Sequence, residues 1–269
     1  MIRRGTRAVT KLYRGAREAV KAYRGTRAVY EKAQPPAPTG VTRLYLTLPD
    51  AATKTLVFQP EADGAVIDWG DGSAPESVAS SSGSAAHAYA AAGDYVVSIR
   101  GTIKYLGMLL GTHNILNQQT GSKGGTSPEL TAVEFGDVEN VCPICFNNCT
   151  SLTEIKVPAT VAVVWQGAFD KTTALKKAEL AARQIDPYAV NAPAIEKVWL
   201  RNTAEEVTAV EGTGEHAGKW FGPFYGCPDT LVLYCEPASR PAGWSEHFDE
   251  YDANGSKLTV VWGRTTRPW

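Results

Sequence analysis

CFNNCTSLTEIKVP, residues 145–158, decides the fold of the second half of the chain, because it recurs. It is echoed by AFDKTTALKKAEL at residues 168–180 and, more weakly, by AVNAPAIEKVWL at residues 189–200. Equivalent leucine-type positions are separated by 23 residues and then by 20, which is the range of a leucine-rich solenoid. Each unit supplies one short strand and one turn, so we expect the units to be stable only when they stack.

These repeats resemble the BspA-type leucine-rich repeat, whose pattern is roughly I-x-x-I-G-x-x-A-F-x-x-C-x-x-L-x-x-I-x-I-P. Phe146 and Phe169 hold the aromatic place of that pattern, and Cys149 holds the cysteine place. The stretch from residue 224 to residue 263 resembles the closing unit of such arrays. The resemblance implies a leucine-rich-repeat domain over residues 103–263.

A second signature precedes the repeats and consists of three runs: VIDWGDGS at residues 66–73, His-Ala-Tyr at 87–89 and GDYVVSI at 93–99. The first run is an apolar strand that ends in a tight Gly-Asp-Gly turn, where glycine supplies the positive φ that other residues resist. In the last run Tyr95, Val97 and Ile99 alternate with Val96 and Ser98, which is the period of two of a strand. It therefore predicts a strand with one buried face.

This signature resembles the PKD domain, a small immunoglobulin-like β-sandwich with a W-x-F-G-D-G turn followed by H-x-Y and G-x-Y-x-V. One departure is that the aromatic residue before Gly-Asp-Gly is Trp69. The resemblance implies a sandwich over residues 41–102 that acts as a spacer or interaction module. The expected fold class is therefore mainly β: an immunoglobulin-like β-sandwich, a short leucine-rich-repeat solenoid and a small N-terminal β-repeat anchor.

Residues 1–33 form a basic ten-residue repeat in which Arg-Gly-Thr or Arg-Gly-Ala recurs at positions 4, 14 and 24. Ten basic residues against two acids give this head a net charge of +8, and the remaining residues carry 17 basic and 26 acidic groups. A heptad-like apolar stripe is compatible with a helix. However, each repeated glycine costs about 1 kcal/mol in a helix interior, and a ten-residue period fits neither common supercoil. Short strands are therefore favoured, and the helix stays open as an alternative.

The basic head is similar to N-terminal V-x-K-x-Y-x-G repeats on structural proteins of phages that infect gut Firmicutes. The similarity implies that the head anchors the protein to other virion proteins. The residues expected to do so are Arg4, Arg14, Arg24, Tyr13 and Tyr23. Three short strands are marginal alone, so we also expect a homo-oligomer. A solvated basic surface and a nucleic-acid arm are alternatives, but the regular Gly and Tyr spacing makes nucleic acid the less favoured partner.

Two shorter segments complete the expected organisation. Residues 34–40 contain three prolines within four positions and are expected to form a semi-rigid linker. Residues 264–269 form a tail that we expect on the surface, in contact with a neighbouring chain. No run of eighteen apolar residues is present, so we expect no membrane span. No apolar h-region follows the first arginines, so we also expect no Sec-type signal peptide.

Catalytic and metal-binding patterns are not recognisable in the sequence. It contains no Gly-x-Ser-x-Gly, phosphate loop or His-Glu-x-x-His. The spacing of Cys142, Cys145 and Cys149 is that of half a zinc site, but their repeat positions favour buried structural cysteines. Three aspartates, Asp68, Asp71 and Asp94, could bind calcium, but capping of turns is favoured. His87 is expected to form a buried hydrogen bond at a strand start. We therefore expect a protein that is not an enzyme, with no metal and no cofactor.

Ligand recognition is expected at aromatic residues near the end of the repeats. The segment from Thr203 to Gly222 interrupts the repeat and leads into KWFGPFY at residues 219–225. Aromatic residues beside Gly and Pro in a loop suit stacking on sugars or a protein hot spot. The candidate binding residues are Trp220, Phe221, Tyr225 and Trp244. In the alternative interpretation, these rings fill the core or cap the solenoid.

The expected function is that of a phage virion protein displayed on the particle. It would be a tail fibre or receptor-binding protein, or a head decoration or head fibre, that binds a host surface protein or glycan. The alternative is a bacterial cell-surface adhesin or carbohydrate-binding module, since both resemblances are common on such proteins. The expected lack of a signal peptide and of a wall anchor favours the virion.

Overall fold

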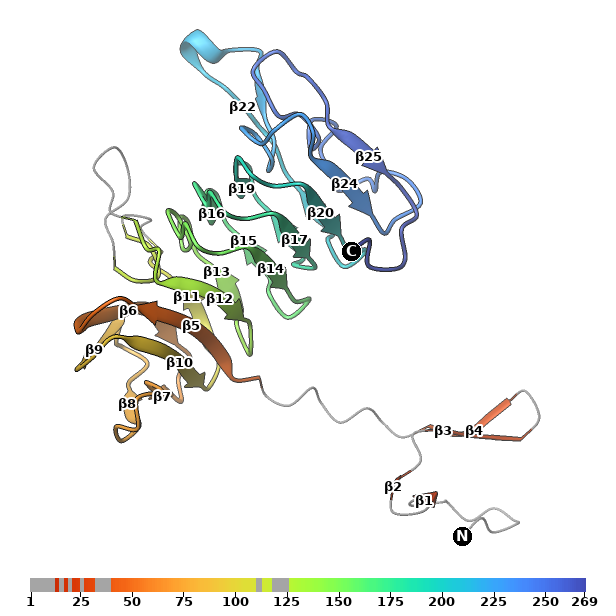
Figure 1. The fold of residues 1–269 in the computed structure, drawn as a ribbon. Coiled ribbons are helices and arrows are strands. Elements are labelled where there is room, and N and C mark those ends of the chain that lie inside the picture. Colours follow the sequence, from red (N-terminus) through yellow and green to blue (C-terminus); the bar gives the residue numbers. More distant parts are fainter. Residues whose placement is uncertain are drawn as a thin grey trace. The chain divides into compact units, whose positions relative to one another are not determined.

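The computed structural model describes residues 40–109, 113–117 and 126–269, together with the backbone of four short strands nearer the N-terminus (Figure 1). The chain forms two compact units, Met1–Thr39 and Gly40–Trp269. The division falls within the proline-rich segment at residues 34–40.

The described backbone of the first unit contains two antiparallel strand pairs. They are β1 (Tyr13–Arg14) with β2 (Arg17–Glu18), and β3 (Lys21–Arg24) with β4 (Arg27–Glu31). These stretches are strands, as the glycine spacing favours. The side chains of the expected anchor residues, Arg4, Arg14, Arg24, Tyr13 and Tyr23, lie outside the described residues.

The second unit is mainly β, and its described residues contain a single short helix, the 3-10 turn η1 (Gly214–His216). Its first sheet has the strand order β12-β5-β10-β7-β8. The bounds are β5 (Thr42–Leu48), β7 (Ala65–Asp68), β8 (Glu76–Val78), β10 (Gly93–Arg100) and β12 (Leu130–Glu134). In β5, Leu44, Leu46 and Leu48 are buried, and the residues between them are not. This alternation places one face of the sheet against a core.

The second sheet continues from the antiparallel part of the unit into the repeats, with the order β9-β6-β11-β13-β15-β18-β21. The bounds are β6 (Ala52–Pro60), β9 (Ser84–Tyr89), β11 (Ile103–Leu106), β13 (Asn140–Val141), β15 (Val163–Val164), β18 (Gln184–Ile185) and β21 (Glu206–Val207). β11 is the point of change, because it pairs antiparallel with β6 and parallel with β13. From β13 onward every pair in this sheet is parallel.

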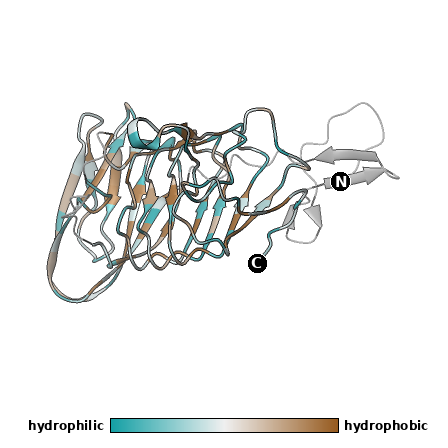
Figure 2. Ribbon diagram, turned by 90° about the horizontal axis from the view of Figure 1, so that it is seen from above, coloured by the Kyte–Doolittle hydropathy of each residue, from teal (hydrophilic) through white to brown (hydrophobic). Residues whose placement is uncertain are grey.

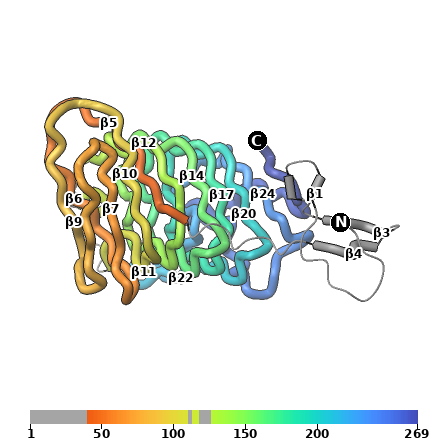
Figure 3. Tube along the Cα trace, turned by 90° about the horizontal axis from the view of Figure 1, so that it is seen from below, coloured from red at the N-terminus to blue at the C-terminus, as the bar shows by residue number. Residues whose placement is uncertain are grey.

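Residues 140–261 form a β-solenoid, seen as a stack of similar turns in Figure 3. A third sheet has the order β14-β17-β20-β24-β25, all parallel, and β16 pairs with β19 beside it. The bounds are β14 (Glu154–Val157), β16 (Phe169–Asp170), β17 (Lys177–Leu180), β19 (Val190–Asn191), β20 (Lys197–Leu200), β24 (Val232–Cys235) and β25 (Thr259–Val261). Parallel pairing in register is what repeats of nearly constant length produce when they stack.

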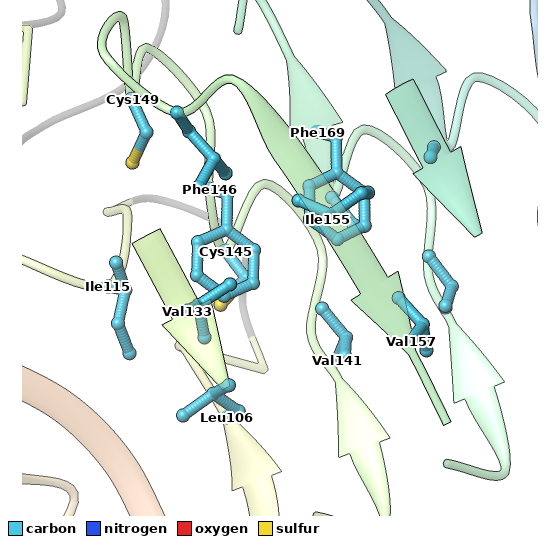
Figure 4. Packing of buried hydrophobic residues seen from close by; sticks show 14 of the residues in the cluster. Leu106, Ile115, Val133, Val141, Cys145, Phe146, Cys149, Ile155, Val157 and Phe169 are labelled. Atoms are coloured by element: carbon cyan, nitrogen blue, oxygen red, sulfur yellow. The ribbon is translucent and has the colours of Figure 1, made fainter. Parts of the chain in front are cut away.

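The predicted equivalence of the repeat residues is visible in the solenoid core. The rings of Phe146 and Phe169 stack with centroids 5.1 Å apart and planes 3° from parallel (Figure 4). Ile155 of β14 and Ala178 of β17 are register partners, and both are buried. Cys145 and Cys149 are also buried, without disulfides, so the cysteines fill space inside the stack. Figure 2 shows hydrophobic residues in strands along the whole unit, as a continuous core requires.

The sheets do not end at residue 102, where the sequence suggests a change of domain. β12 adds to the first sheet by pairing with β5, and β11 carries the second sheet into the solenoid. A single cluster of buried apolar side chains extends from Leu44 to Leu258. The region at residues 41–102 and the solenoid therefore share the second sheet and one core, and the first sheet also extends past residue 102 through β12.

The interruption of the repeat begins later than residue 203. β21 pairs in parallel with β18, and the backbone N–H of Thr208 still donates to Ile185 at 3.0 Å. The regular solenoid turn therefore continues to residue 208. The inserted segment then forms β22 (Val210–Glu211), η1 and β23 (Trp220–Phe221), with β22 and β23 antiparallel. The sequence obscures this boundary because the strand at residues 206–207 is only two residues long.

No helix in the described part of the chain is long and apolar enough to cross a membrane.

Candidate binding surface

The Trp-Gly-Asp-Gly turn is held by aromatic stacking and by carboxylates that accept backbone N–H groups. The indole of Trp69 is buried and stacks on the imidazole of His87, with centroids 4.9 Å apart. The hydroxyl of Tyr89 donates to the carbonyl of Trp69 at 3.1 Å. Nε2 of His87 lies 2.7 Å from Oδ2 of Asp71. His87 thus forms a hydrogen bond, but from a partly buried position inside β9 (Ser84–Tyr89) and not from the start of a strand as expected.

The carboxylates of Asp68, Asp71 and Asp94 all accept hydrogen bonds from groups of the protein. Asp68 accepts from the N–H of Gly70 at 3.0 Å, and Asp71 accepts from the N–H of Ser73 at 3.0 Å. Hydrogen bonds from Ser73 and His87 hold the pKa of Asp71 well below its usual range. Asp94 accepts instead from the Thr47 hydroxyl at 2.7 Å. Within residues 40–109, 113–117 and 126–269, no group of three or more His, Cys, Asp or Glu side chains is arranged to hold a metal ion.

The cysteines have the properties of packing residues. All five are buried and free of disulfides. Burial raises the pKa of the thiols of Cys142, Cys227 and Cys235 to about 12 in each case. A thiol that stays protonated at neutral pH is a poor nucleophile and a poor metal ligand.

Three of the four candidate binding residues gather around strand β23. Phe221 lies under two tyrosine rings: its centroid is 5.3 Å from that of Tyr188 and 4.7 Å from that of Tyr225. The two tyrosine rings meet edge to face at 5.5 Å. We call these three residues the Tyr188 cluster. Phe221 is buried, and both tyrosines are partly exposed.

Trp220, the neighbour of Phe221, belongs to a different pair of rings. Its indole stacks on the imidazole of His247, with centroids 4.3 Å apart and planes 3° from parallel. Successive strand residues point to opposite sides, so Trp220 and Phe221 face away from each other across β23. The Trp220–His247 stack and the Tyr188 cluster are therefore the two sides of one inserted hairpin.

Charged groups surround the Trp220–His247 stack. Nδ1 of His247 lies 2.7 Å from a carboxylate oxygen of Glu250, and Nε2 lies 3.6 Å from Glu246. The ammonium of Lys257 lies 3.0 Å from Asp249. The imidazole covers one face of the indole, and Trp220 stays partly exposed. A flat apolar ring beside carboxylates suits a ligand with both C–H faces and hydroxyl groups.

Trp244 is placed elsewhere, in contrast to the expectation that it contacts a ligand. Only 1% of it is exposed, and its indole N–H donates to the carbonyl of Ala204 at 2.8 Å. Its ring packs against Phe248 and Trp262. Because the side chain is enclosed, its role is to close the end of the solenoid.

Tyr188 is the residue of this surface that the sequence did not indicate. It lies in the solenoid turn before β19 and has a positive φ of 57°. Burial, and then the neighbouring Tyr225, raise the pKa of its hydroxyl. The available signal is a large aromatic residue at a turn position that Ile144 and Gly167, which also have positive φ, occupy in the two preceding units. The position can be recognised as equivalent only when the register of the units is known.

Comparison of the chain with models of known protein families, with characterised proteins and with solved structures gives no match. Function must therefore be inferred from the residues themselves.

Proposed function

We propose that this chain is a non-enzymatic display protein of a phage particle, anchored through residues 1–33 and binding a host surface glycan or protein through the hairpin around β23. The observation that carries the proposal is the pair of aromatic groups around the inserted hairpin, the Trp220–His247 stack and the Tyr188 cluster, in which Trp220, Tyr188 and Tyr225 are partly exposed. Aromatic residues on a rigid support lose little conformational entropy when a ligand binds.

The finer fold assignments belong to the same proposal. We infer that residues 41–102 are an immunoglobulin-like sandwich of the PKD type, and that the solenoid units are of the BspA type. Support for the first comes from the contacts of Trp69, His87 and Tyr89 around the Gly-Asp-Gly turn. Support for the second comes from the stacked Phe146 and Phe169 and from the buried Cys149. Both kinds of module serve display and recognition in other proteins, so the inference from module to function is an analogy.

Replacing Trp220 with alanine is expected to weaken binding to host cells by about 30-fold, the effect of a hot-spot aromatic residue. The change should leave the free energy of unfolding within about 1 kcal/mol of the original value, because the ring is partly exposed. The measurement is binding of purified labelled protein to host cells or to their extracted surface glycans.

The matched control is Val210→Ala, which removes a 47% exposed apolar side chain from the paired strand β22; Val210 lies opposite Phe221, whereas Trp220 lies opposite Glu211. It should bind as the original protein does. Equal loss of binding in both variants would show that the hairpin matters only as a fold. No loss in Trp220→Ala would remove the stack from the proposal.

Deleting residues 1–33 is expected to abolish association with particles and leave a folded body, because Gly40–Trp269 is a compact unit with its own core. The measurement is quantitative mass spectrometry of purified DNA-containing particles and of washed cells. The proposal requires the full chain at stoichiometric levels in the particles and the truncated chain only in the supernatant. Retention of the truncated chain on particles contradicts the anchor, and presence on washed cells alone supports an adhesin.

A further inference from the structure

The C-terminal residues Arg264–Trp269, here called the tail, cross the outer face of the third sheet. The N–H of Arg264 donates to Cys235 of β24 at 2.8 Å, and its carbonyl accepts from the indole of Trp199 of β20 at 3.1 Å. Nε of Arg267 lies 3.8 Å from Glu179 of β17. In Figure 1 the C-terminus lies beside β20, consistent with these contacts. The tail therefore runs across the strands and is not added to the ladder.

The tail ends on β14, at a carboxylate. Glu154 accepts a hydrogen bond from the guanidinium of Arg267, and the indole N–H of Trp269 lies 3.4 Å from the same oxygen. The guanidinium also lies over the indole of Trp269, 5.1 Å from its centroid. We call Glu154, Glu179 and Trp199 the tail seat, because each contacts the tail from a different strand.

Glu179 is the distinctive member of the tail seat. Its side chain is on the outer face of β17, between inward-facing Ala178 and Leu180, yet it is only 2% exposed. Oε1 accepts a hydrogen bond from Arg201 at 2.6 Å. Oε2 has no hydrogen-bond partner, and two cations, Lys156 and Arg267, lie 3.8 Å from it. A carboxylate this buried requires compensating cations. Without the tail, Lys156 would be the only one of these two cations left near Oε2.

Trp199 is covered in the same way. It is register partner to Glu179 and points to the same outer face, and only 4% of it is exposed. The guanidinium of Arg201 lies 4.2 Å from its ring centroid, and the tail carbonyl takes its N–H. The tail seat thus combines a buried carboxylate, a second carboxylate and an indole N–H, which together suit an extended segment with arginine followed by an aromatic residue.

The tail is held by side chains and can leave without disrupting the sheet. Its contact with the sheet backbone is the single bond from Arg264, and the side chain of Arg267 is 39% exposed. The exposed pair of Arg267 with Glu154 contributes at most about 1 kcal/mol. Gly263, directly before the tail, has φ of +72°, a conformation that glycine adopts without strain, so the chain can turn there. Its N–H donates to the carbonyl of Pro237 at 2.8 Å, so the backbone is held on the body up to this residue.

We propose that the tail seat also takes the tail of a second copy, so that neighbouring copies exchange tails. The second copy supplies the arginine and tryptophan that complete the site around Glu179. The contacts are the same within one chain and between chains, so local concentration decides between them. A short tether gives an effective concentration of roughly millimolar, so exchange is expected where copies are crowded. This inference does not rest on the proposed function.

The test uses two full-chain variants with complementary defects. One carries Glu154→Gln and Glu179→Gln, which removes both carboxylates of the tail seat and leaves the tail intact. The other carries Arg267→Ala and Trp269→Ala, which leaves an intact seat without a tail. In sedimentation velocity, their equimolar mixture is expected to form a complex that neither variant forms alone. A mixture that sediments as the sum of its components overturns the proposal.

A second measurement removes any contribution of the N-terminal head. A labelled peptide with the sequence of residues 263–269 is titrated into the Arg267→Ala, Trp269→Ala chain and followed by fluorescence anisotropy. Saturable binding is expected, weakened about tenfold by further Glu154→Gln, since a charge-assisted hydrogen bond is lost. Glu154 is 41% exposed, so this change cannot unfold the core. Glu205→Gln, outside the tail seat, is the control. Equal affinity in the Glu154 and Glu205 variants contradicts the proposal.

Discussion

Replacing Trp244 with alanine is expected to lower the free energy of unfolding by about 3–5 kcal/mol, the range for truncating a buried tryptophan. The indole fills the space between Phe248 and Trp262, and its N–H satisfies the carbonyl of Ala204. The substitution leaves both a cavity and an unpaired buried carbonyl. Its backbone also forms a bridge with Val207, at the last strand of the second sheet. The end of the solenoid should loosen first.

The measurement is urea unfolding followed by circular dichroism, with Trp220→Ala as the matched control. Both variants lose an indole from the same end of the unit, but only Trp244 is enclosed. A difference of at least about 2 kcal/mol between them is expected from the difference in burial. If the two variants unfold at the same urea concentration with the same slope, Trp244 is not a core residue. The expectation that Trp244 contacts a ligand would then be favoured over a role in the core.

Replacing Gly70 with alanine is expected to cost about 3 kcal/mol, through two separable effects. The residue has φ of +78°, which costs a residue with a side chain about 1–2 kcal/mol. An added Cβ would also lie 2.5 Å from the carbonyl oxygen of Val96, so strand β10 would have to move. Such displacement in a packed region costs about 1–3 kcal/mol.

Gly72 in the same turn separates the two effects. Its φ is +84°, nearly that of Gly70, but a Cβ there meets nothing within 4 Å. Gly72→Ala should therefore show the cost of the backbone conformation alone. Thermal unfolding of both variants measures the difference. Equal destabilisation would mean that the turn does not approach β10 as closely as described.

The repeated part of the fold is predictable because its information is local. Phe146 and Phe169 occupy equivalent places in consecutive units, so their stacking follows from the spacing of the sequence. The same holds for Cys145, which stands where the next unit carries Ala168, and both residues are buried. The alternation around Val97 and Ile99 likewise predicts the buried face of β10, and both side chains are buried.

Long-range pairings are not predictable in this way. Leu44 of β5 lies opposite Val133 of β12, and nothing near either residue identifies the other as its partner. The shared sheet across residue 102 therefore escapes a division of the chain by motifs. The same limit applies to the candidate site, since Tyr188 and Phe221 meet only after the solenoid turns have stacked.

Outward-facing residues pose a different difficulty. In the sequence, Glu179 resembles any polar residue on the solvent side of a strand, and Lys156 one unit earlier is such a residue. The groups that lie against its carboxylate, Arg201 at 2.6 Å and Arg267 of the tail at 3.8 Å, are distant in the sequence. Trp220 and Trp244 are likewise both tryptophans near glycine and proline, and their different environments depend on which loop closes the last strand.

The passage of both sheets across residue 102 has a mechanical consequence. If two domains were joined by a flexible connection, the binding surface around β23 would change its orientation relative to the rest of the body. Here β11 belongs to both parts, so bending at that point would break inter-strand hydrogen bonds and open the shared core. The body from Gly40 onward should therefore transmit force and orientation as one stiff rod, with the hairpin around β23 held at a constant distance from β5.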